Sequence, residues 1–303
     1  MVSRACLLLI VCFTLGSCDR AGPAQGVAWE FERDGSRVLL LPTVHVGSQK
    51  PPKLSAALKD RLFNSSSLLV ELNIRAPDVL RELQDCRHLS LGNSNTQISE
   101  DVADRMVEVF PEIRDELRKD PPSTSSAMSF VVWQTKAHHR LHAKHGLDTQ
   151  LIDLFGRSGK TILSLERPCA QMIMIGHATA VATNSTVLEA LEIYLKGDLA
   201  TWVDQFYVGW RDGSWQYMKC STLNFDRRYP HQKLANAVGI DQRNPELAQA
   251  ISKAAVDKPL VVAAVGVRHF VGNNSLPREL LSLGFRTNVD ITEWTGPCDE
   301  PNR

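Results

Sequence analysis

Two apolar stretches near opposite ends of the chain share one pattern, and this pattern constrains the fold more than any other feature. Residues 260–272 read LVVAAVGVRHFVG, where the apolar run predicts a strand that is buried on both faces and ends at Gly266. Residues 38–47 read VLLLPTVHVG and predict a second buried strand that runs into a proline. His269 and His45 each follow the turn residue by three positions. Because ligands of open α/β sheets bind at the carboxyl ends of strands, we expect both histidines at one site.

The alternation of predicted strands and helices indicates an α/β fold with a largely parallel central sheet flanked by helices. Asp34-Gly35, between two alternating runs, is typical of a β-hairpin turn. Residues 75–122 show helical periodicity and predict a mostly helical insertion in the middle of the chain. A final strand is expected over residues 285–291. The repeated strand–histidine pattern also suggests two related halves.

Two further predicted strands end in carboxylates, Glu71 after the apolar run 68–70 and Glu166 at the end of 160–166. A metal or a basic partner would explain Glu71, and an exposed position at the strand end would explain it equally well. Together with the histidines, these carboxylates form a set of oxygen and nitrogen donors of the kind that divalent metals use. Asp148, which precedes a predicted helix, is expected to be its N-cap.

A second group of histidines lies in the predicted helix 129–145. His138, His142 and His145 would share one helical face, a spacing that could hold a metal. The lysines and arginines among them oppose a cation, so we favour a solvated polar face. His177 lies in an apolar, methionine-rich helix and is expected in the core.

The N-terminus has the features of a secretion signal. A basic residue precedes the apolar run 5–15, which is short for a membrane span and suited to a signal peptide. Leu15-Gly16-Ser17-Cys18 resembles the lipobox of bacterial lipoproteins, which implies cleavage before Cys18 and lipidation of that cysteine. An ordinary cleaved signal or an uncleaved anchor is the alternative. We therefore expect a lipid-anchored protein that faces the periplasm, and Asp19 slightly favours the inner membrane.

This signal divides the chain into four parts. We expect a signal peptide over 1–17, a lipid-anchored tether over 18–26, one α/β domain over 27–294 and a loose tail over 295–303. The formal net charge of +0 gives no indication of a nucleic-acid surface. Four cysteines remain after the lipidated one, and in an oxidising compartment they permit two disulfides in three connectivities: Cys86, Cys169, Cys220 and Cys298.

Several motifs, taken in order, resemble the TraB/GumN family, also called TraB/PrgY. They are LLPTVHVGS, the VEL around Glu71, HGLDTQLIDLFGRSGKTILSLE, YLKGDL, QRN at 242–244 and VGVRHFVGNNSLPRELLSLGFRT. The resemblance covers nearly the whole mature chain. Three positions depart from the family pattern: Pro42 replaces a glycine, Arg167 a threonine and Gln242 a glutamate.

The family is similar to Tiki metalloproteases, erythromycin esterases and ChaN-like proteins, which implies a metal-dependent hydrolase, peptidase-like, with a peptide or small ester or amide as substrate. The resemblance makes His45, Glu71 and His269 the metal ligands, for Mn²⁺, Co²⁺ or Zn²⁺. Glu166 would be a further ligand or general base, Arg243 would stabilise developing negative charge, and Glu71 is a further candidate base. Two alternatives stay open: capture of a peptide such as a pheromone without cleavage, and a structural envelope lipoprotein whose site has decayed at Pro42.

Overall fold

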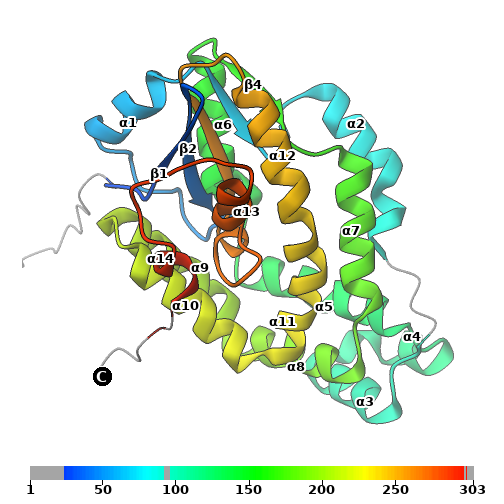
Figure 1. Cartoon of the computed structure of the whole chain (residues 1–303). Coiled ribbons are helices and arrows are strands. Elements are labelled where there is room, and N and C mark those ends of the chain that lie inside the picture. The colour runs from blue at the N-terminus through cyan, green and yellow to red at the C-terminus, as the bar shows by residue number, and fades with distance from the viewer. Residues whose placement is uncertain (1–23, 92–95, 297, 299–303) are drawn as a thin grey trace, which may run out of the picture.

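The computed structural model describes residues 24–91, 96–296 and 298, and a five-stranded sheet lies at its centre (Figure 1). The strands are β1 (Trp29–Arg33), β2 (Ser36–Thr43), β3 (Ser67–Val70), β4 (Thr161–Ser164) and β5 (Val261–Gly266). Their order across the sheet is β1-β2-β5-β3-β4. Only the β1–β2 pair is antiparallel among these strands, so the expected largely parallel sheet is confirmed.

Helices flank this sheet, as expected for the α/β class. The α-helices are α1 (Ala56–Phe63), α2 (Pro77–Cys86), α3 (Glu100–Val109), α4 (Arg114–Lys119), α5 (Thr124–His138), α6 (Leu147–Arg157), α7 (Pro168–Ala180), α8 (Asn184–Lys196), α9 (Asp198–Asp212), α10 (Trp215–Arg228), α11 (Pro230–Gly239), α12 (Asn244–Ala255), α13 (Leu276–Ser282) and α14 (Thr292–Thr295). Short 3₁₀-helices are η1 (Arg87–Leu91), η2 (Pro111–Ile113), η3 (Ala143–His145), η4 (Asp241–Arg243) and η5 (Val267–Phe270). Within the described part of the chain, no helix is long and apolar enough to cross a membrane.

The first two strands form the expected hairpin. Its turn residues Asp34 and Gly35 have φ values of 52° and 78°, the left-handed region that this pair of residues tolerates. Pro42, in contrast, does not turn the chain but continues β2 opposite Val265 of β5. The pairing of β1 ends opposite Leu40, so Pro42 extends past that neighbour, a position where a strand residue without an N–H is tolerated.

The sheet is buried because its middle strands are continuous apolar runs rather than alternating ones. Residues 38–41 of β2 and 261–265 of β5 are 0–1% exposed. Helix α12 packs against β2 and β5, and α6 packs against β3 and β4. The central strands therefore form a rigid frame whose ends can hold side chains in fixed positions.

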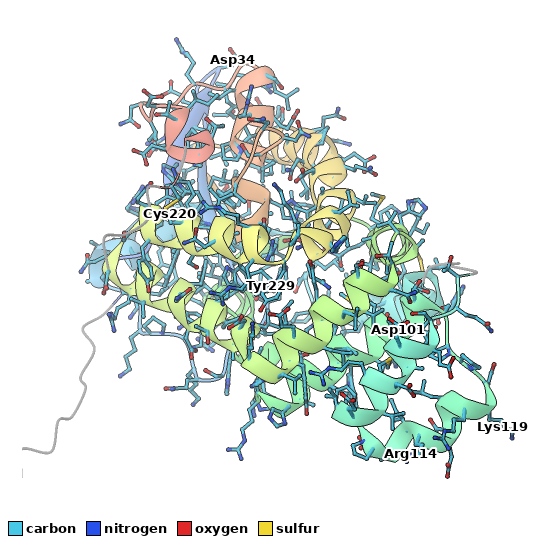
Figure 2. The ribbon with its side chains drawn as sticks, turned by 90° about the horizontal axis from the view of Figure 1, so that it is seen from below. Asp34, Asp101, Arg114, Lys119, Cys220 and Tyr229 are labelled. Carbon is cyan, nitrogen blue, oxygen red and sulfur yellow. A yellow bond between two sulfur atoms is a disulfide. The ribbon has the colours of Figure 1, made fainter. Side chains whose placement is uncertain are left out.

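The described residues between β3 and β4 are mostly helical, which confirms the expected insertion. Helices α3 and α5 of this insertion form a second hydrophobic cluster together with α8, away from the sheet: Ile98, Val102, Met106, Phe110, Leu117, Ala127, Val131, Val187, Ala190 and Leu191. In Figure 2, Arg114 and Lys119 of α4 lie at the opposite end of the view from Asp34 in the hairpin turn. The insertion thus packs on a second core that it shares with α8.

Two predicted elements are wrong. The helix expected over 129–145 ends at His138, because Arg140 adopts a left-handed conformation with φ 53° and breaks the hydrogen-bond ladder. The strand expected over 285–291 is reduced to one bridge between Arg286 and Glu32. Polar residues follow this bridge and lead into α14, so the ladder does not continue.

Both ends of the described chain are attached to the domain. Ala24, part of the expected tether, is buried and donates its N–H to the Lys53 carbonyl at 2.7 Å. The expected signal peptide and Cys18 lie outside the described residues. The disulfides Cys86–Cys169 and Cys220–Cys298 select one of the three connectivities, and the second joins the expected tail to α10.

Candidate active site

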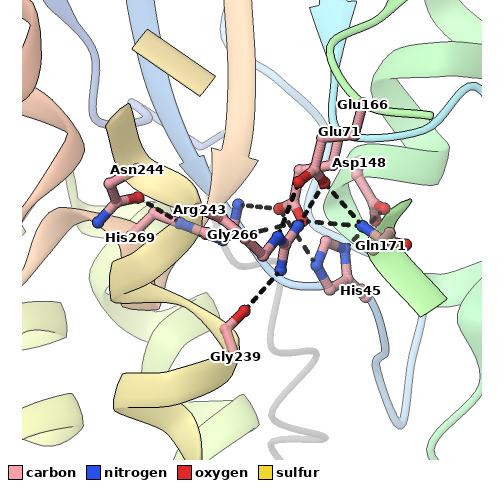
Figure 3. Close-up of polar contacts among 10 residues, drawn as sticks. All are labelled: His45, Glu71, Asp148, Glu166, Gln171, Gly239, Arg243, Asn244, Gly266 and His269. Carbon is pink, nitrogen blue, oxygen red and sulfur yellow. Dashed lines mark hydrogen bonds and ion pairs between the residues drawn. The ribbon is translucent and has the colours of Figure 1, made fainter. Parts of the chain in front are cut away.

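The carboxyl ends of four strands bring the predicted polar residues to one edge of the sheet (Figure 3). His45 lies two residues after β2, Glu71 directly after β3, and Glu166 two residues after β4. His269 lies in η5, which follows β5. Because β2, β5, β3 and β4 are parallel neighbours, their ends face the same edge. The predicted convergence of the two histidines and two glutamates is observed.

Glu71 is at the centre of this cluster and is only 6% exposed. Its Oε1 accepts the Gly266 N–H at 2.8 Å, and its Oε2 accepts from Arg243 Nη2 at 2.6 Å. A Cβ at Gly266 would lie 3.2 Å from this Oε1 and 3.3 Å from His45 Nε2, so glycine permits the close approach. Burial acts to raise the pKa of Glu71, but His45 and Arg243 outweigh it and hold the pKa well below its usual value.

Arg243 joins the two carboxylates. Its Nε donates to Glu166 Oε1 at 2.8 Å, and its Nη2 donates to both Glu71 and Glu166 Oε2. Gln171 Nε2 also donates to Glu166 Oε2 at 3.0 Å. Burial acts to lower the pKa of Arg243, but the two carboxylates raise it, so the guanidinium stays charged. Glu71 therefore has a basic partner, and the alternative of an exposed position at the strand end is wrong.

His45 is oriented by the carboxylate of Asp148, which was expected to cap a helix. Its Nδ1 donates to Asp148 Oδ2 at 2.9 Å, while its Nε2 lies 3.4 Å from Glu71 Oε1. Burial acts to lower the pKa of His45, but Asp148 and Glu71 raise it well above its ordinary value. The side chain is nevertheless 56% exposed, which leaves one face of the imidazole open to a ligand.

His269 differs from His45, whose raised pKa favours the charged ring. It is 2% exposed, and burial is the largest cause that lowers its pKa to about 3, so the ring is neutral. Asn244 Nδ2 donates to the Asn274 carbonyl, which orients the amide so that its Oδ1 accepts from His269 Nδ1 at 2.6 Å. The unprotonated Nε2 then faces Glu71 Oε2 at 3.8 Å.

These contacts decide how well a divalent metal fits. Both histidines have their Nδ1 anchored and their Nε2 turned toward Glu71, as metal-binding imidazoles do. However, both oxygens of Glu71 are already hydrogen-bonded, and the positive charge of Arg243 beside Glu71 opposes the binding of a cation. Within the described residues, no three His, Cys, Asp or Glu side chains are arranged to hold a metal ion. The set His45, Glu71 and His269 does not fit a three-ligand site in this arrangement.

The remaining histidines do not form a site either. His142 lies beyond the end of α5, so it does not share a helical face with His138, and both side chains are exposed. His177, expected in the core, is exposed on α7.

A cavity of about 810 Å³ opens beside the cluster, and its lining includes His45, Glu71 and Arg243. This volume is typical of small-molecule sites. Most of the other lining side chains are apolar, among them Ile74, Leu83, Met172, Ile175, Leu199 and Ile240. The polar cluster is thus one end of a largely apolar cavity.

Three residues of the cluster were missed from the sequence. Asp148 lies in the first turn of α6, where the N-cap is Gly146, and its carboxylate binds His45 instead of the helix end. Asn244 appears in the sequence only as the last residue of the QRN motif at 242–244, and no pattern singles out Gln171. For Asp148, its place in the quoted HGLDT stretch was the available signal.

The comparisons with known proteins agree with the motifs. The TraB/PrgY/gumN family model matches residues 27–288, which include every residue of the cluster. No curated protein and no solved structure gives a match to the chain. The family model covers most of the chain, and the chain belongs to the TraB/PrgY/gumN family.

Proposed function

We propose that this protein is a hydrolase of amide or ester bonds in which His45 activates the attacking water. One observation carries the proposal: Asp148 fixes His45 Nδ1 at 2.9 Å, while the other side of the ring lies open to the cavity. Below its raised pKa His45 is an imidazolium, so it acts as a base only above this pKa, where the Asp148 carboxylate selects the tautomer with an unprotonated Nε2.

In the proposed reaction, water attacks the carbonyl carbon and gives a proton to His45 Nε2. Asp148 and Glu71 stabilise the resulting imidazolium, since both carboxylates favour the charged ring. The imidazolium then donates this proton to the leaving nitrogen or oxygen as its bond to carbon breaks. The reaction consumes one water molecule for each bond that is cleaved.

In this proposal, Glu166 and Arg243 do not contact the substrate and act only through Glu71. Arg243 is 8% exposed and its donors are engaged by Glu71 and Glu166, so it is poorly placed to touch a substrate. We propose that this pair holds Glu71 beside His45, in place of the direct catalytic roles that the family resemblance suggested.

Metal dependence is a separate hypothesis, because it comes from the family resemblance. Mn²⁺, Co²⁺ or Zn²⁺ would have the Nε2 atoms of His45 and His269 as its nearest donors, and Glu71 would join them only after release from Arg243. The mechanism above uses no step that depends on such an ion.

We also propose a cellular location for the protein. The lipobox-like sequence before Cys18 supports lipid anchoring in the bacterial cell envelope with the domain in the periplasm. Two disulfides in the described chain are compatible with an oxidising compartment.

The test compares the parent protein with His45→Ala on a panel of aryl esters and apolar peptides. Loss of a general base should lower kcat by about 10²–10⁴-fold. His142→Ala is the matched control, because this exposed histidine is not part of the cavity lining. Equal turnover by His45→Ala and the parent would refute the proposal. If the parent binds peptides without cleaving them, the binding alternative is correct.

A further inference from the structure

The cations around the cavity differ in their partners. Three side chains of lysine or arginine line it: Lys136, Arg243 and Arg268. Arg243 is paired with Glu71 and Glu166, as described above. Arg268 is ion-paired with Asp226, and its guanidinium also lies over the Trp202 ring at 5.2 Å. For the ammonium group of Lys136, the described residues provide no ion pair and no hydrogen bond.

Lys136 lies in the last turn of α5, on a wall that includes Ala143 and Leu199. Its side chain is exposed and lines the cavity, and the neighbouring protein atoms lower the pKa of its ammonium group by desolvation. Water solvates an exposed ammonium group, and an anionic ligand in the cavity can replace this water. Because no carboxylate of the described chain pairs with Lys136, its charge is available to such a ligand.

The rest of the wall defines the ligand further. Leu83 of α2, and Met172 and Ile175 of α7, are apolar and give an uncharged body favourable contacts. The disulfide Cys86–Cys169 joins these two helices and fixes this wall. The cavity therefore combines a cation, apolar walls and the His45 cluster.

We propose that the substrate of this cavity is an apolar amide that carries a free carboxylate, and that Lys136 binds the carboxylate. The inference rests on the proposed hydrolase function and names its substrate class. Two sources share this chemistry: an N-acyl amino acid and the C-terminal end of an apolar peptide. In either case water adds to the carbonyl carbon, the C–N bond breaks, and the nitrogen leaves with the proton from His45.

Matched pairs of ligands test the carboxylate. N-decanoylleucine is compared with N-decanoylleucinamide, and a free apolar tripeptide is compared with its C-terminal amide. For each compound, Kd is measured by calorimetry and KM by release of the product. A hydrogen bond to a charged group corresponds to about a tenfold to hundredfold change in Kd. We expect each free acid to bind more tightly than its amide by this factor.

Variants of Lys136 test the residue. Lys136→Gln should remove the preference for the acids and leave the binding of the amides unchanged, and Lys136→Arg should restore it. Lys144→Gln is the control, because Lys144 is exposed and does not line the cavity. The pair with the larger ratio of Kd between amide and acid, acyl amino acid or peptide, identifies which of the two substrates the cavity binds.

The outcomes separate the two proposals. Binding of the acid that depends on Lys136, without cleavage by the parent, supports the carboxylate site and refutes the hydrolase. Cleavage of acid and amide at equal KM supports the hydrolase and overturns the carboxylate site. Binding of neither compound, or an equal loss of both in Lys136→Gln, also overturns it.

Discussion

Replacing Arg243 by leucine would remove the one guanidinium that holds two buried carboxylates together. Arg243 donates to Glu166 Oε1 at 2.8 Å and to Glu71 Oε2 at 2.6 Å, and all three side chains are at most 11% exposed. Removing one partner of a buried ion pair costs about 3–5 kcal/mol. Since Arg243→Leu leaves two carboxylates without it, we expect a loss near 5 kcal/mol, or about 10–20 °C in Tm for a domain of this size.

The loss should depend on pH. In the parent, the pKa of Glu71 is lowered, so this group stabilises the fold above its ordinary pKa of 4.5, and the stabilisation is lost as the pH falls through the lower folded value. In Arg243→Leu, the guanidinium no longer offsets burial, so the pKa of Glu71 rises from its lowered value, although His45 still acts to lower it. The folded variant then takes up a proton more readily than the parent. The difference in stability between the two proteins should therefore be larger at about pH 8 than at about pH 5.

Urea unfolding followed by circular dichroism at both pH values measures this difference. Arg37→Leu is the control, because Arg37 forms an exposed pair with Glu30 at 3.2 Å and should lose only about 0–1 kcal/mol. A loss below about 1 kcal/mol for Arg243→Leu, or an equal loss at both pH values, would show that Arg243 does not hold the carboxylates as described.

Three further predictions concern the chemistry and the anchor. Asp148 raises the pKa of His45, so the acidic limb of the kcat/KM–pH profile should lie above pH 6.5 in the parent protein. In Asp148→Asn this limb should move to lower pH, and the activity should fall about 10–100-fold. A limb that does not move would contradict the assignment of His45 as the base. If the parent retains metal after incubation with Mn²⁺, Co²⁺ or Zn²⁺, the double variant His45→Ala/His269→Ala should lose it in elemental analysis, and retention by both would place the ion elsewhere. Mass spectrometry of the membrane-bound protein should find lipid on Cys18, and Cys18→Ala should abolish membrane attachment; attachment of this variant would refute lipidation.

The parts of the site that follow strands could be predicted from the sequence. His45, Glu71, Glu166 and His269 each lie within a few residues of an apolar run, and parallel strands place such positions at one edge. Local periodicity also predicted the hairpin and the helical insertion. The two related halves, suggested by the same repeat, remain a prediction.

The contacts that connect distant segments could not be predicted. Asp148 binds His45 across 103 positions, and its local context is equally that of a helix cap. The order β1-β2-β5-β3-β4 depends on crossovers that no local pattern encodes. The expected helix 129–145 failed because a single residue, Arg140, adopts a left-handed conformation that its neighbours do not signal.

The helical insertion has a consequence for how proteins of this architecture can diverge. The ionisable groups of the cluster come mainly from strand ends of the sheet, whereas Leu83 and Lys136 of the cavity wall belong to the segment between β3 and β4. Part of that segment packs with α8 on a hydrophobic cluster separate from the sheet core. The part of this segment that precedes α6 can change while α6 keeps Asp148 and its packing against β3 and β4, so one catalytic frame can acquire new ligand preferences through that part alone.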